Sequence, residues 1–400
     1  MNERELKIEE LLTRGVAEVI DVEHLRKRLL NGEKLRVKLG IDPTSPDIHL
    51  GRSVTLLKLR DFQELGCQVV FIVGNFTGLI GDTSDKEAER PMLDEVTVTF
   101  NMSSYFDQAA KVLDMESVER HFNAEWLREL GFLEIGEQAD AFSVHEFISR
   151  ENIKKRLDAG KRVSLREILY PLMQGYDSVQ VKADVEIGGT DQRFNVLAGR
   201  TLQSKYGQAP QDVLTVNLIP GVDGRKMSSS WGNTINLNDN QNDMYGKVMS
   251  IPDEQIGTYL VHATRVSMSD IDALVSGMGD GSVNPRDAKM RLAKEIVTMY
   301  HSEESATAAE EYFVTAFSKR EIPQDIGELA VSDGSESLID YIVRSGNATS
   351  RADARRKIEQ GGVSIGDDKV TDWALVLDKS AHDGAVIKIG KIGFVKVKWD

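Results

Sequence analysis

The sequence has a single cysteine, Cys67, among its 400 residues, so no disulfide can form within the chain. It has no apolar run long enough to span a bilayer, and its first five residues are acidic rather than typical of a secretory signal. We therefore expect a protein of the reducing cytoplasm with no membrane partner. Histidines are also few, and none has the spacing of a metal ligand, so we expect no zinc.

The sequence has fewer basic than acidic residues. The chain has 49 Lys and Arg against 64 Asp and Glu, a net charge of −15, which disfavours general binding to nucleic acid. The deficit is uneven, because residues 335–400 contain 11 basic and 10 acidic residues. Any contact with nucleic acid must therefore come from this tail or from local patches.

The front of the chain alternates apolar strands with helices. Residues 4–30 predict one or two amphipathic helices, followed by a strand at 36–41, a Pro-rich turn and a helix at 53–65. A fully apolar strand at 68–73 is typical of a parallel strand buried on both faces. Strand, helix and strand form a right-handed βαβ unit, so we expect an α/β fold with a doubly wound parallel sheet.

The Pro-rich turn predicts an anion site. Thr44 and His49 bracket it, and Gly51 lets a flat group approach the backbone closely. Unpaired backbone N–H groups at the start of the next helix would attract a negative charge. These residues alone fit any phosphate-binding turn between a strand and a helix.

Two more Gly-bearing loops follow strands, where a doubly wound sheet binds its ligands. Residues 74–85 present Thr77 and Asp82, a hydroxyl and a carboxylate suited to a cation such as an amine. Residues 188–192 follow a strand-like run at 181–187 and present Asp191, a residue type that accepts hydrogen bonds from ribose hydroxyls.

The region between these loops is predicted to be mostly helical. Residues 92–165 form an insertion between the halves of the sheet, with no chemistry that we recognise and with apolar helix faces suited to a subunit interface. A helix at 165–178 then carries Tyr170, Gln174 and Asp177 on one face. This mixture amid leucines predicts the wall of a polar pocket.

The second half of the chain carries two groups of cations. Residues 220–230, after a strand at 213–218, are either a surface linker or a mobile lid that brings Lys226 and a serine cluster onto a polyphosphate. Helices follow to residue 318. In the last 65 residues, five cations favour contact with an RNA backbone over a merely solvated face: Arg344, Arg351, Arg355, Arg356 and Lys357.

In order and spacing these stretches resemble the tyrosyl-tRNA synthetases, which are class I aminoacyl-tRNA synthetases, and especially their second bacterial form. The family's first signature, His-Ile-Gly-His, corresponds to residues 49–52 and its second, Lys-Met-Ser-Lys-Ser, to residues 226–230. Residues 77–82, 170–178 and 188–192 match its amino-group, tyrosine and ribose sites. The resemblance covers nearly the whole chain.

The resemblance implies a domain order and a reaction. The implied domains are a Rossmann-like catalytic domain at 1–230 with a helical insertion at about 92–165, an α-helical anticodon-binding domain at 231–318, a linker at 319–335, and a small α+β, αL-type RNA-binding domain at 336–400. ATP, with Mg²⁺, and L-tyrosine would give tyrosyl-adenylate, and the tyrosyl group would pass to tRNA(Tyr). A homodimer formed through the insertion is also implied.

The resemblance also implies residue roles. The implied catalytic residues, which hold the terminal phosphates as pyrophosphate leaves, are Thr44, His49 and Lys226. The implied ATP-binding residues are Asp42, Gly51, Arg52, Gly189, Asp191, Lys226, Met227, Ser228 and Ser229. The implied tyrosine-binding residues are Lys38, Thr77, Asp82, Tyr170, Gln174, Asp177 and Gln192. Asp177 would accept from the phenol hydroxyl, and would be left unpaired if phenylalanine entered.

Three positions depart from the family pattern. Arg52 replaces the second His of the first signature, and Ser229 replaces the second Lys of the mobile loop, where a bound monovalent cation would supply the missing charge. Lys38 stands where many relatives have a Tyr, and is either a charge near the phenol pocket or a strand residue turned away. Two alternatives therefore stay open: a catalytically weak RNA-binding paralogue, which Arg52 and Ser229 favour, and a tryptophan enzyme, which Asp177 disfavours.

Overall fold

A six-stranded sheet forms the centre of the catalytic part of the chain in the computed structural model. The structure describes residues 1–84, 91–319, 326–331, 335–366, 368–390 and 393–399. The strand order is β1-β6-β5-β2-β3-β4, and all neighbours are parallel except β1 and β6. The strands are β1 Val16–Ile20, β2 Arg36–Ile41, β3 Gln68–Val73, β4 Glu119–Phe122, β5 Val185–Gly189 and β6 Asp212–Val216.

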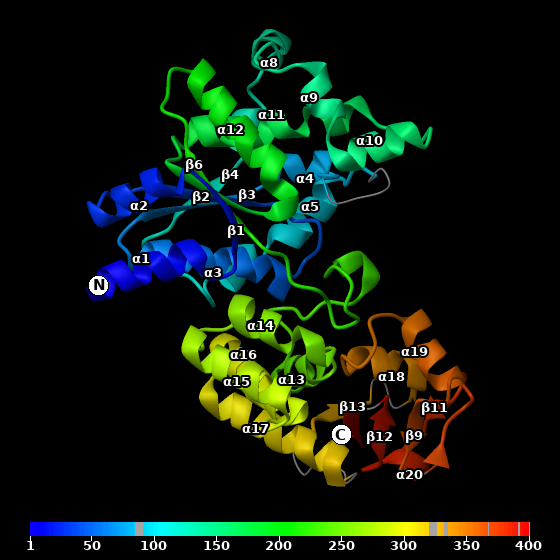
Figure 1. Ribbon diagram of the computed structural model, residues 1–400. Coiled ribbons are helices and arrows are strands. Elements are labelled where there is room, and N and C mark those ends of the chain that lie inside the picture. The colour runs from blue at the N-terminus through cyan, green and yellow to red at the C-terminus, as the bar shows by residue number, and fades with distance from the viewer. Residues whose placement is uncertain (85–90, 320–325, 332–334, 367, 391–392, 400) are drawn as a thin grey trace. The chain divides into compact units, whose positions relative to one another are not determined.

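Helices cover both faces of this sheet, with α1 and α3 on one side and α11 and α12 on the other (Figure 1). The helices before β5 are α1 Glu3–Thr13, α2 Val22–Leu30, α3 Leu50–Glu64, α4 Thr77–Ile80, α5 Glu95–Met102, α6 Tyr105–Ala109, α7 Ala124–Leu127, α8 Phe132–Ala139, α9 Val144–Ile148, α10 Glu151–Asp158 and α11 Leu165–Gln180. Those after it in the same unit are η1 Thr190–Gln192, α12 Arg193–Lys205, η2 Ser229–Trp231, η3 Asp253–Gln255, α14 Ile256–Ala263, α15 Met268–Asp280 and α16 Pro285–Tyr300.

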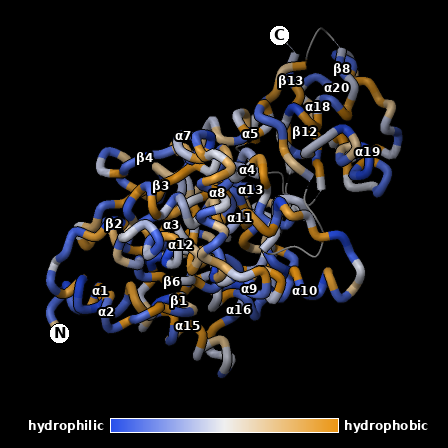
Figure 2. The backbone as a smooth tube through the Cα atoms, turned by 90° about the horizontal axis from the view of Figure 1, so that it is seen from above, coloured by the Kyte–Doolittle hydropathy of each residue, from blue (hydrophilic) through white to orange (hydrophobic). Residues whose placement is uncertain are grey.

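The predicted α/β fold class is confirmed. Strands β2 and β3 begin and end at the predicted residues, and they pair in parallel with Lys38 opposite Val70. Every residue of β3 after Gln68 is buried, because helices cover both faces of the strand, and the hydrophobic run is orange in Figure 2.

Two strands were not predicted. Residues 16–20 were expected to be helical but form β1, which pairs antiparallel with β6. Gly15, at a φ of 66°, ends the preceding helical run, and the β-branched residues that follow suit an edge strand. The insertion at 92–165 is mostly helical, as expected, but it also contains β4, which pairs with β3.

The chain divides into two compact units, residues 1–239 with 250–300, and residues 240–249 with 301–400. The second unit contains α13 Gln241–Met249, α17 Glu303–Phe313, η4 Val314–Lys319, α18 Leu338–Arg344, α19 Arg351–Glu359 and α20 Lys379–His382. Its sheets have the orders β10-β9-β12-β13-β7 and β11-β8. The strands are β7 Glu328–Ala330, β8 Glu336–Ser337, β9 Val363–Ile365, β10 Asp368–Lys369, β11 Val376–Leu377, β12 Val386–Ile389 and β13 Gly393–Lys398.

The predicted domain boundaries stay predictions. The linker at 319–335 falls partly on residues 320–325 and 332–334, which lie outside the described residues. Within the described part, residues 328–330 form β7, which pairs in parallel with β13. No helix of the described chain is long and apolar enough to cross a membrane.

Candidate active site

A cleft of about 390 Å³ lies at the carboxyl ends of β2, β3 and β5. Its walls come from the turn before α3, the loop after β3, the inner face of α11, the turn after β5 and the loop at 220–230. Every predicted catalytic, ATP-binding and tyrosine-binding residue except Lys38 lines this cleft. Its volume is within the range of sites for small organic ligands.

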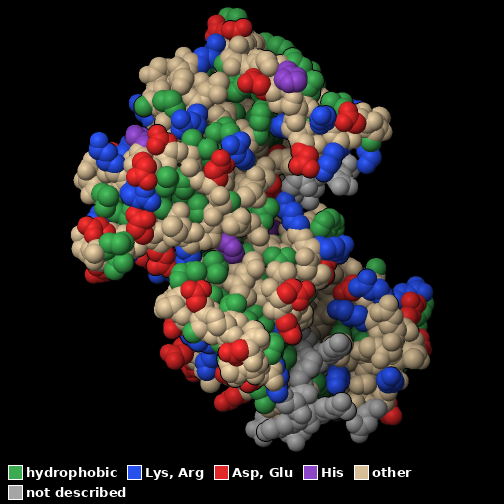
Figure 3. Space-filling view, in the orientation of Figure 1, with side chains coloured by type: hydrophobic (Ala, Val, Ile, Leu, Met, Phe, Trp, Pro, Cys, Tyr) green, Lys and Arg blue, Asp and Glu red, His purple; other side chains and the backbone are tan. Residues whose placement is uncertain are grey.

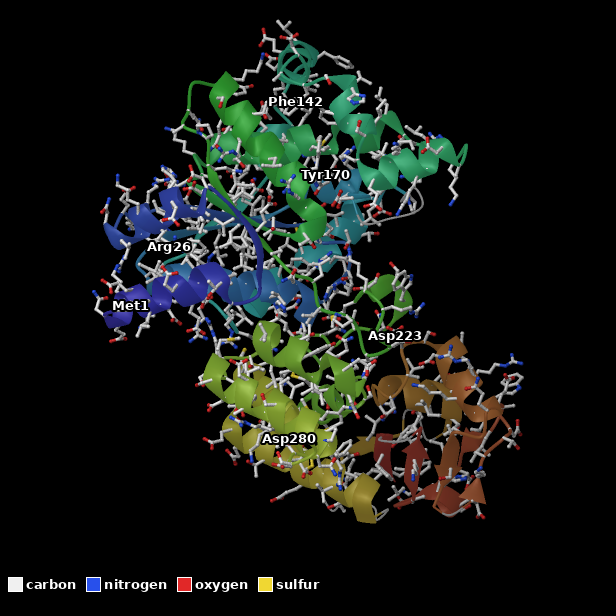
Figure 4. All side chains as sticks on the ribbon, in the orientation of Figure 1. Met1, Arg26, Phe142, Tyr170, Asp223 and Asp280 are labelled. Atoms are coloured by element: carbon white, nitrogen blue, oxygen red, sulfur yellow. The ribbon has the colours of Figure 1, made fainter. Side chains whose placement is uncertain are left out.

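One group of polar side chains in the cleft centres on Asp42. Thr77 Oγ1 donates to Asp42 Oδ1 at 2.7 Å, and the Tyr170 hydroxyl donates to Asp42 Oδ2 at 2.8 Å. Tyr170 projects from α11 (Figure 4). Burial raises the pKa of Asp42 to about 6, against the hydrogen bonds from Thr77 and Tyr170 that lower it. Asp42, predicted beside ATP, therefore lies among the predicted amino-group ligands.

The second carboxylate, Asp82, is held by its own loop and by Gln192. The Ser84 backbone N–H donates to Asp82 Oδ1, and Gln192 Nε2 donates to Oδ2 at 2.7 Å. Asp42 and Asp82 are close enough for the charge of Asp82 to raise the pKa of Asp42. Two acidic groups at one end of a cleft suit a bound ammonium group.

The predicted phenol acceptor, Asp177, is buried at the cleft wall and held by two residues that the sequence did not reveal. Trp126 Nε1 donates to Asp177 Oδ1 at 2.7 Å, and Asn123 Nδ2 donates to Oδ2 at 3.2 Å. Asn123 also donates to Thr77 Oγ1. The insertion at 92–165, in which the sequence showed no chemistry, thus supplies two hydrogen-bond donors at the cleft wall. Its strand β4 joins the sheet, which brings the residues after it to this wall.

The backbone N–H groups at the start of α3 already have hydrogen-bond acceptors, unlike those of an open anion-binding site. The Leu50 N–H donates to the carbonyl of Ile235, and the Gly51 N–H donates to Met227 Sδ at 3.2 Å. The first N–H groups are therefore already paired, contrary to the expectation of unpaired donors. An alanine Cβ at Gly51 would lie 3.0 Å from the His49 ring, so glycine keeps this contact open.

Arg52 has a clear structural role. Its guanidinium donates to Thr44 Oγ1 at 2.8 Å, to the carbonyl of Asp42 at 3.0 Å and to the Tyr105 hydroxyl at 3.1 Å. It therefore fixes Thr44 and holds the turn against α6. The same group places a positive charge in the cleft wall.

The loop at 220–230, which includes Asp223 of Figure 4, lines one side of the cleft with residues 226–230. Lys226 Nζ lies 2.9 Å from Asp191 Oδ2, and Ser229 Oγ donates to Ser45 Oγ at 3.2 Å. Asn233, which the sequence did not single out, accepts from the Ser228 N–H and donates to the carbonyl of Lys226. These two hydrogen bonds hold residues 226–228 of the loop in place.

Lys38 is buried outside the cleft and does not line it. Its ammonium lies 2.9 Å from Glu186 Oε1 and donates to Ser178 Oγ and to the carbonyl of Gln174. Its charge still lowers the pKa of the neighbouring Asp177. Of the two alternatives for Lys38, a charge behind the pocket fits the geometry.

The five predicted RNA-binding cations lie in the second unit, on or next to α18 and α19, and each is paired with a carboxylate. Their carboxylate partners are Glu336, Asp340, Glu359 and Asp353, the last of which serves both Arg356 and Lys357. The four arginine side chains are 40–68% exposed, whereas the Glu336 and Asp353 carboxylates are largely buried. Arg355 also stacks on Trp373, 4.2 Å from the ring centre.

Among the described residues, no group of three or more His, Cys, Asp or Glu side chains could hold a metal ion. The absence of zinc stays a prediction.

Residues 30–318 match the family model for class I tRNA synthetases of the W and Y type. The chain belongs to the class I tRNA synthetases. Residues 319–395 match a second family, the SYY-like C-terminal domain of tyrosine–tRNA ligases. The family resemblance drawn from the motifs is confirmed.

Similar class I synthetases span the whole chain. The tyrosine–tRNA ligase of Moorella thermoacetica is 45% identical over 399 residues, which cover 98% of this chain and 95% of that protein. The tyrosine–tRNA ligase of Thermotoga maritima is 42% identical over 388 residues, which cover 97% of this chain and 96% of that protein.

Solved synthetase structures show the same fold. The tyrosyl-tRNA synthetase of Archaeoglobus fulgidus with L-tyrosine superposes with a TM-score of 0.61 at 22% identity, covering 76% of this chain and 99% of that one. A C-terminally truncated mitochondrial tyrosyl-tRNA synthetase of Aspergillus nidulans superposes with a TM-score of 0.65 at 22% identity. The match covers 78% of this chain and 94% of that one.

Proposed function

We propose that this chain joins L-tyrosine to tRNA(Tyr) in two steps, through tyrosyl-adenylate. The observation that carries the substrate choice is Asp177, a buried carboxylate that lines the cleft and is fixed by Trp126 and Asn123. A fixed acceptor there suits a phenol hydroxyl. The full-length relatives reported above are tyrosine–tRNA ligases, which supports the same reaction.

In this proposal the amino acid lies between two polar ends. Asp177 accepts from the phenol, and Asp82, Thr77, Tyr170 and Gln174 surround the ammonium. Because the Tyr170 hydroxyl donates its proton to Asp42, its oxygen is left to accept from the ammonium. Gln192, held by Asp82, lies beside the carboxylate or the amine.

ATP occupies the other end, with Gly189 and Asp191 at the ribose and Gly51 beside the adenosine. A tyrosine carboxylate oxygen attacks the α-phosphate as the bond to pyrophosphate breaks, so negative charge grows on the leaving group. Thr44, His49, Arg52 and Lys226 stabilise that charge together with the Mg²⁺ that arrives with ATP. A monovalent cation near Ser229 would supply the positive charge that a second lysine provides in the family's usual loop signature.

The direct test is aminoacylation. The purified chain, ATP, Mg²⁺ and tRNA(Tyr) should attach labelled tyrosine to the tRNA, and omitting ATP should abolish it. A chain that folds but charges no tRNA under these conditions would favour the paralogue without activity. A cytoplasmic location of the reaction is part of the proposal.

The affinity for tyrosine should depend on pH through Asp177. Burial raises the pKa of Asp177 to about 7, against the lowering effects of Lys38, Trp126 and Asn123. Only the ionised form accepts well from the phenol, and its fraction falls from about nine-tenths at pH 8 to about one-tenth at pH 6. The tyrosine KM should therefore rise about tenfold over this range. Asp177→Asn should flatten that dependence, and an equally steep profile in the variant would contradict the assignment.

The arginines of α19 should bind the tRNA backbone. Replacing Arg351, Arg355 and Arg356 by Gln should lower the slope of log affinity against log salt by up to about 3 and raise the tRNA KM. Adenylate formation should not change, because it uses only the cleft. The matched control replaces the exposed cations Lys7, Lys27 and Lys34, which removes the same charge. Equal effects of the two triple variants would mean that only net charge matters.

We also propose that a second copy of the chain covers the insertion. The insertion exposes large apolar side chains on α5, α8 and α9, among them Phe132 at 96% and Val96 at 80%, and Figure 3 shows hydrophobic side chains over α8 and α9. A monomer rarely leaves such side chains in water. Phe132→Asp with Leu133→Asp should halve the mass measured by light scattering, whereas Val275→Asp on α15 should not. A monomeric wild-type chain would refute the dimer.

A further inference from the structure

The pair formed by Lys38 and Glu186 lies behind the tyrosine pocket. The two residues are directly opposite each other on neighbouring parallel strands, β2 and β5, and their side chains are 0% and 1% exposed. A buried ion pair seldom stabilises a fold more than well-packed apolar residues would, because both charges lose their water. Stability therefore does not account for this pair.

Glu186 is connected to the pocket through Gln174. Its Oε1 accepts from Gln174 Nε2 at 3.0 Å, and its Oε2 accepts from Ser178 Oγ at 3.0 Å and from Gln211 Nε2. Lys38 donates to the carbonyl of Gln174 at 2.8 Å. The ion pair thus holds both the side chain and the main chain of one cleft residue.

This arrangement fixes the direction of the Gln174 amide. An ionised carboxylate can only accept, so the NH₂ group of Gln174 must face Glu186. Turning the amide by 180° would bring two acceptor oxygens together. The remaining Oε1 atom is then directed away from Glu186, and Gln174 lines the cleft. The amide therefore offers the substrate an acceptor rather than a donor.

We propose that Glu186, neutralised by Lys38, is a positioning residue for the amino acid substrate: it orients Gln174 so that its carbonyl oxygen accepts from the ammonium group of tyrosine. The proposal rests on the role given above to Gln174. Glu186 itself does not contact the substrate. Lys38 compensates the negative charge of Glu186, which lowers the free-energy cost of burying it.

The test is a double-mutant cycle on tyrosine and ATP kinetics in ATP–pyrophosphate exchange. Glu186→Gln should raise the tyrosine KM about tenfold, because the amide of Gln174 is no longer held, and leave the ATP KM within about twofold. If Glu186→Gln fails to fold with Lys38 unpaired, Glu186→Asp keeps the charge beside Lys38 but shortens the side chain away from Gln174, and should show the same selective rise. The same Glu186 substitutions in a Gln174→Ala background should add nothing, because the effect passes through Gln174.

The matched control is Asp212→Asn on the adjacent strand β6. Asp212 is a buried carboxylate paired with His24 and Arg28, so its loss should lower the melting temperature without changing the tyrosine KM. A folded Glu186 variant with an unchanged tyrosine KM would overturn the proposal. So would a double variant in which the effects of the Glu186 and Gln174→Ala substitutions on the tyrosine KM are fully additive. If Gln174→Ala alone leaves the tyrosine KM unchanged, the role of Gln174 in the proposed function fails instead.

Discussion

Replacing Lys226 by methionine should lower kcat for tyrosyl-adenylate formation by about 10²–10³-fold, the usual cost of losing a donor aimed at developing charge. Lys226 lines the cleft 2.9 Å from Asp191. In the proposed reaction the ATP ribose competes for Asp191, which leaves the ammonium to the phosphates. The loss should appear in kcat, because the charge that Lys226 stabilises grows only as pyrophosphate leaves.

The control for Lys226 lies next to it in the chain. Arg225 pairs with Asp223 at the exposed tip of the loop, so Arg225→Met should change kcat by less than about twofold. Pre-steady-state formation of the adenylate is the direct measurement. If Lys226→Met raised the tyrosine KM and left kcat intact, the lysine would serve binding, not the leaving group.

Gly74→Ala should reduce kcat/KM for tyrosine by about 10²-fold. A Cβ at this position would lie 2.1 Å from Asp42 Oδ1 and 2.4 Å from Thr77 Oγ1, so both side chains must move. The Asp42 hydrogen bonds from Thr77 and Tyr170 would be lost or distorted, and hydrogen bonds to charged groups are worth about 1.5–3 kcal/mol each. About 1.4 kcal/mol corresponds to one factor of ten.

The effect of Gly74→Ala should be local. Gly279 lies in the helix α15 with no atom within 4 Å of an added Cβ, and Gly279→Ala should leave activity unchanged. Circular dichroism and a thermal melt would show whether the Gly74 variant still folds. A folded Gly74→Ala enzyme with wild-type kinetics would mean that the Asp42 group is not needed to bind tyrosine.

Much of the site could be predicted because its residues follow strands. In a parallel sheet the carboxyl ends lie at one edge, so Thr44, Thr77 and Asp191, far apart in the chain, were expected to meet there. The helix face with Tyr170 and Asp177 added one wall. Periodicity placed these elements to within a few residues, as β2 and β3 show.

Other parts of the site could not be predicted from local pattern. Asn123 and Trp126 follow a four-residue strand in a region that reads as helical, and only the pairing of β4 with β3 brings them to Asp177. The partner of Lys38 was hidden for a similar reason, because Glu186 is 148 residues further along the chain and meets it only through strand register. Long-range pairing leaves no trace in a single sequence.

The departures from the family signatures also have physical explanations. Arg52 donates to Thr44 and to the Asp42 carbonyl, so it holds the turn between β2 and α3 in place. Ser229 donates to Ser45 Oγ, so its hydroxyl links the loop at 220–230 to the turn between β2 and α3. Neither residue therefore favours the catalytically weak paralogue.

The central claim is that the cleft activates tyrosine and selects it through Asp177. ATP–pyrophosphate exchange with tyrosine, phenylalanine and tryptophan, on one preparation, tests it most directly. We predict rapid exchange with tyrosine and little with the other two, because phenylalanine leaves the buried Asp177 unpaired and tryptophan has no phenol hydroxyl. No exchange with any of the three would contradict the enzyme assignment, and a preference for tryptophan would contradict the specificity.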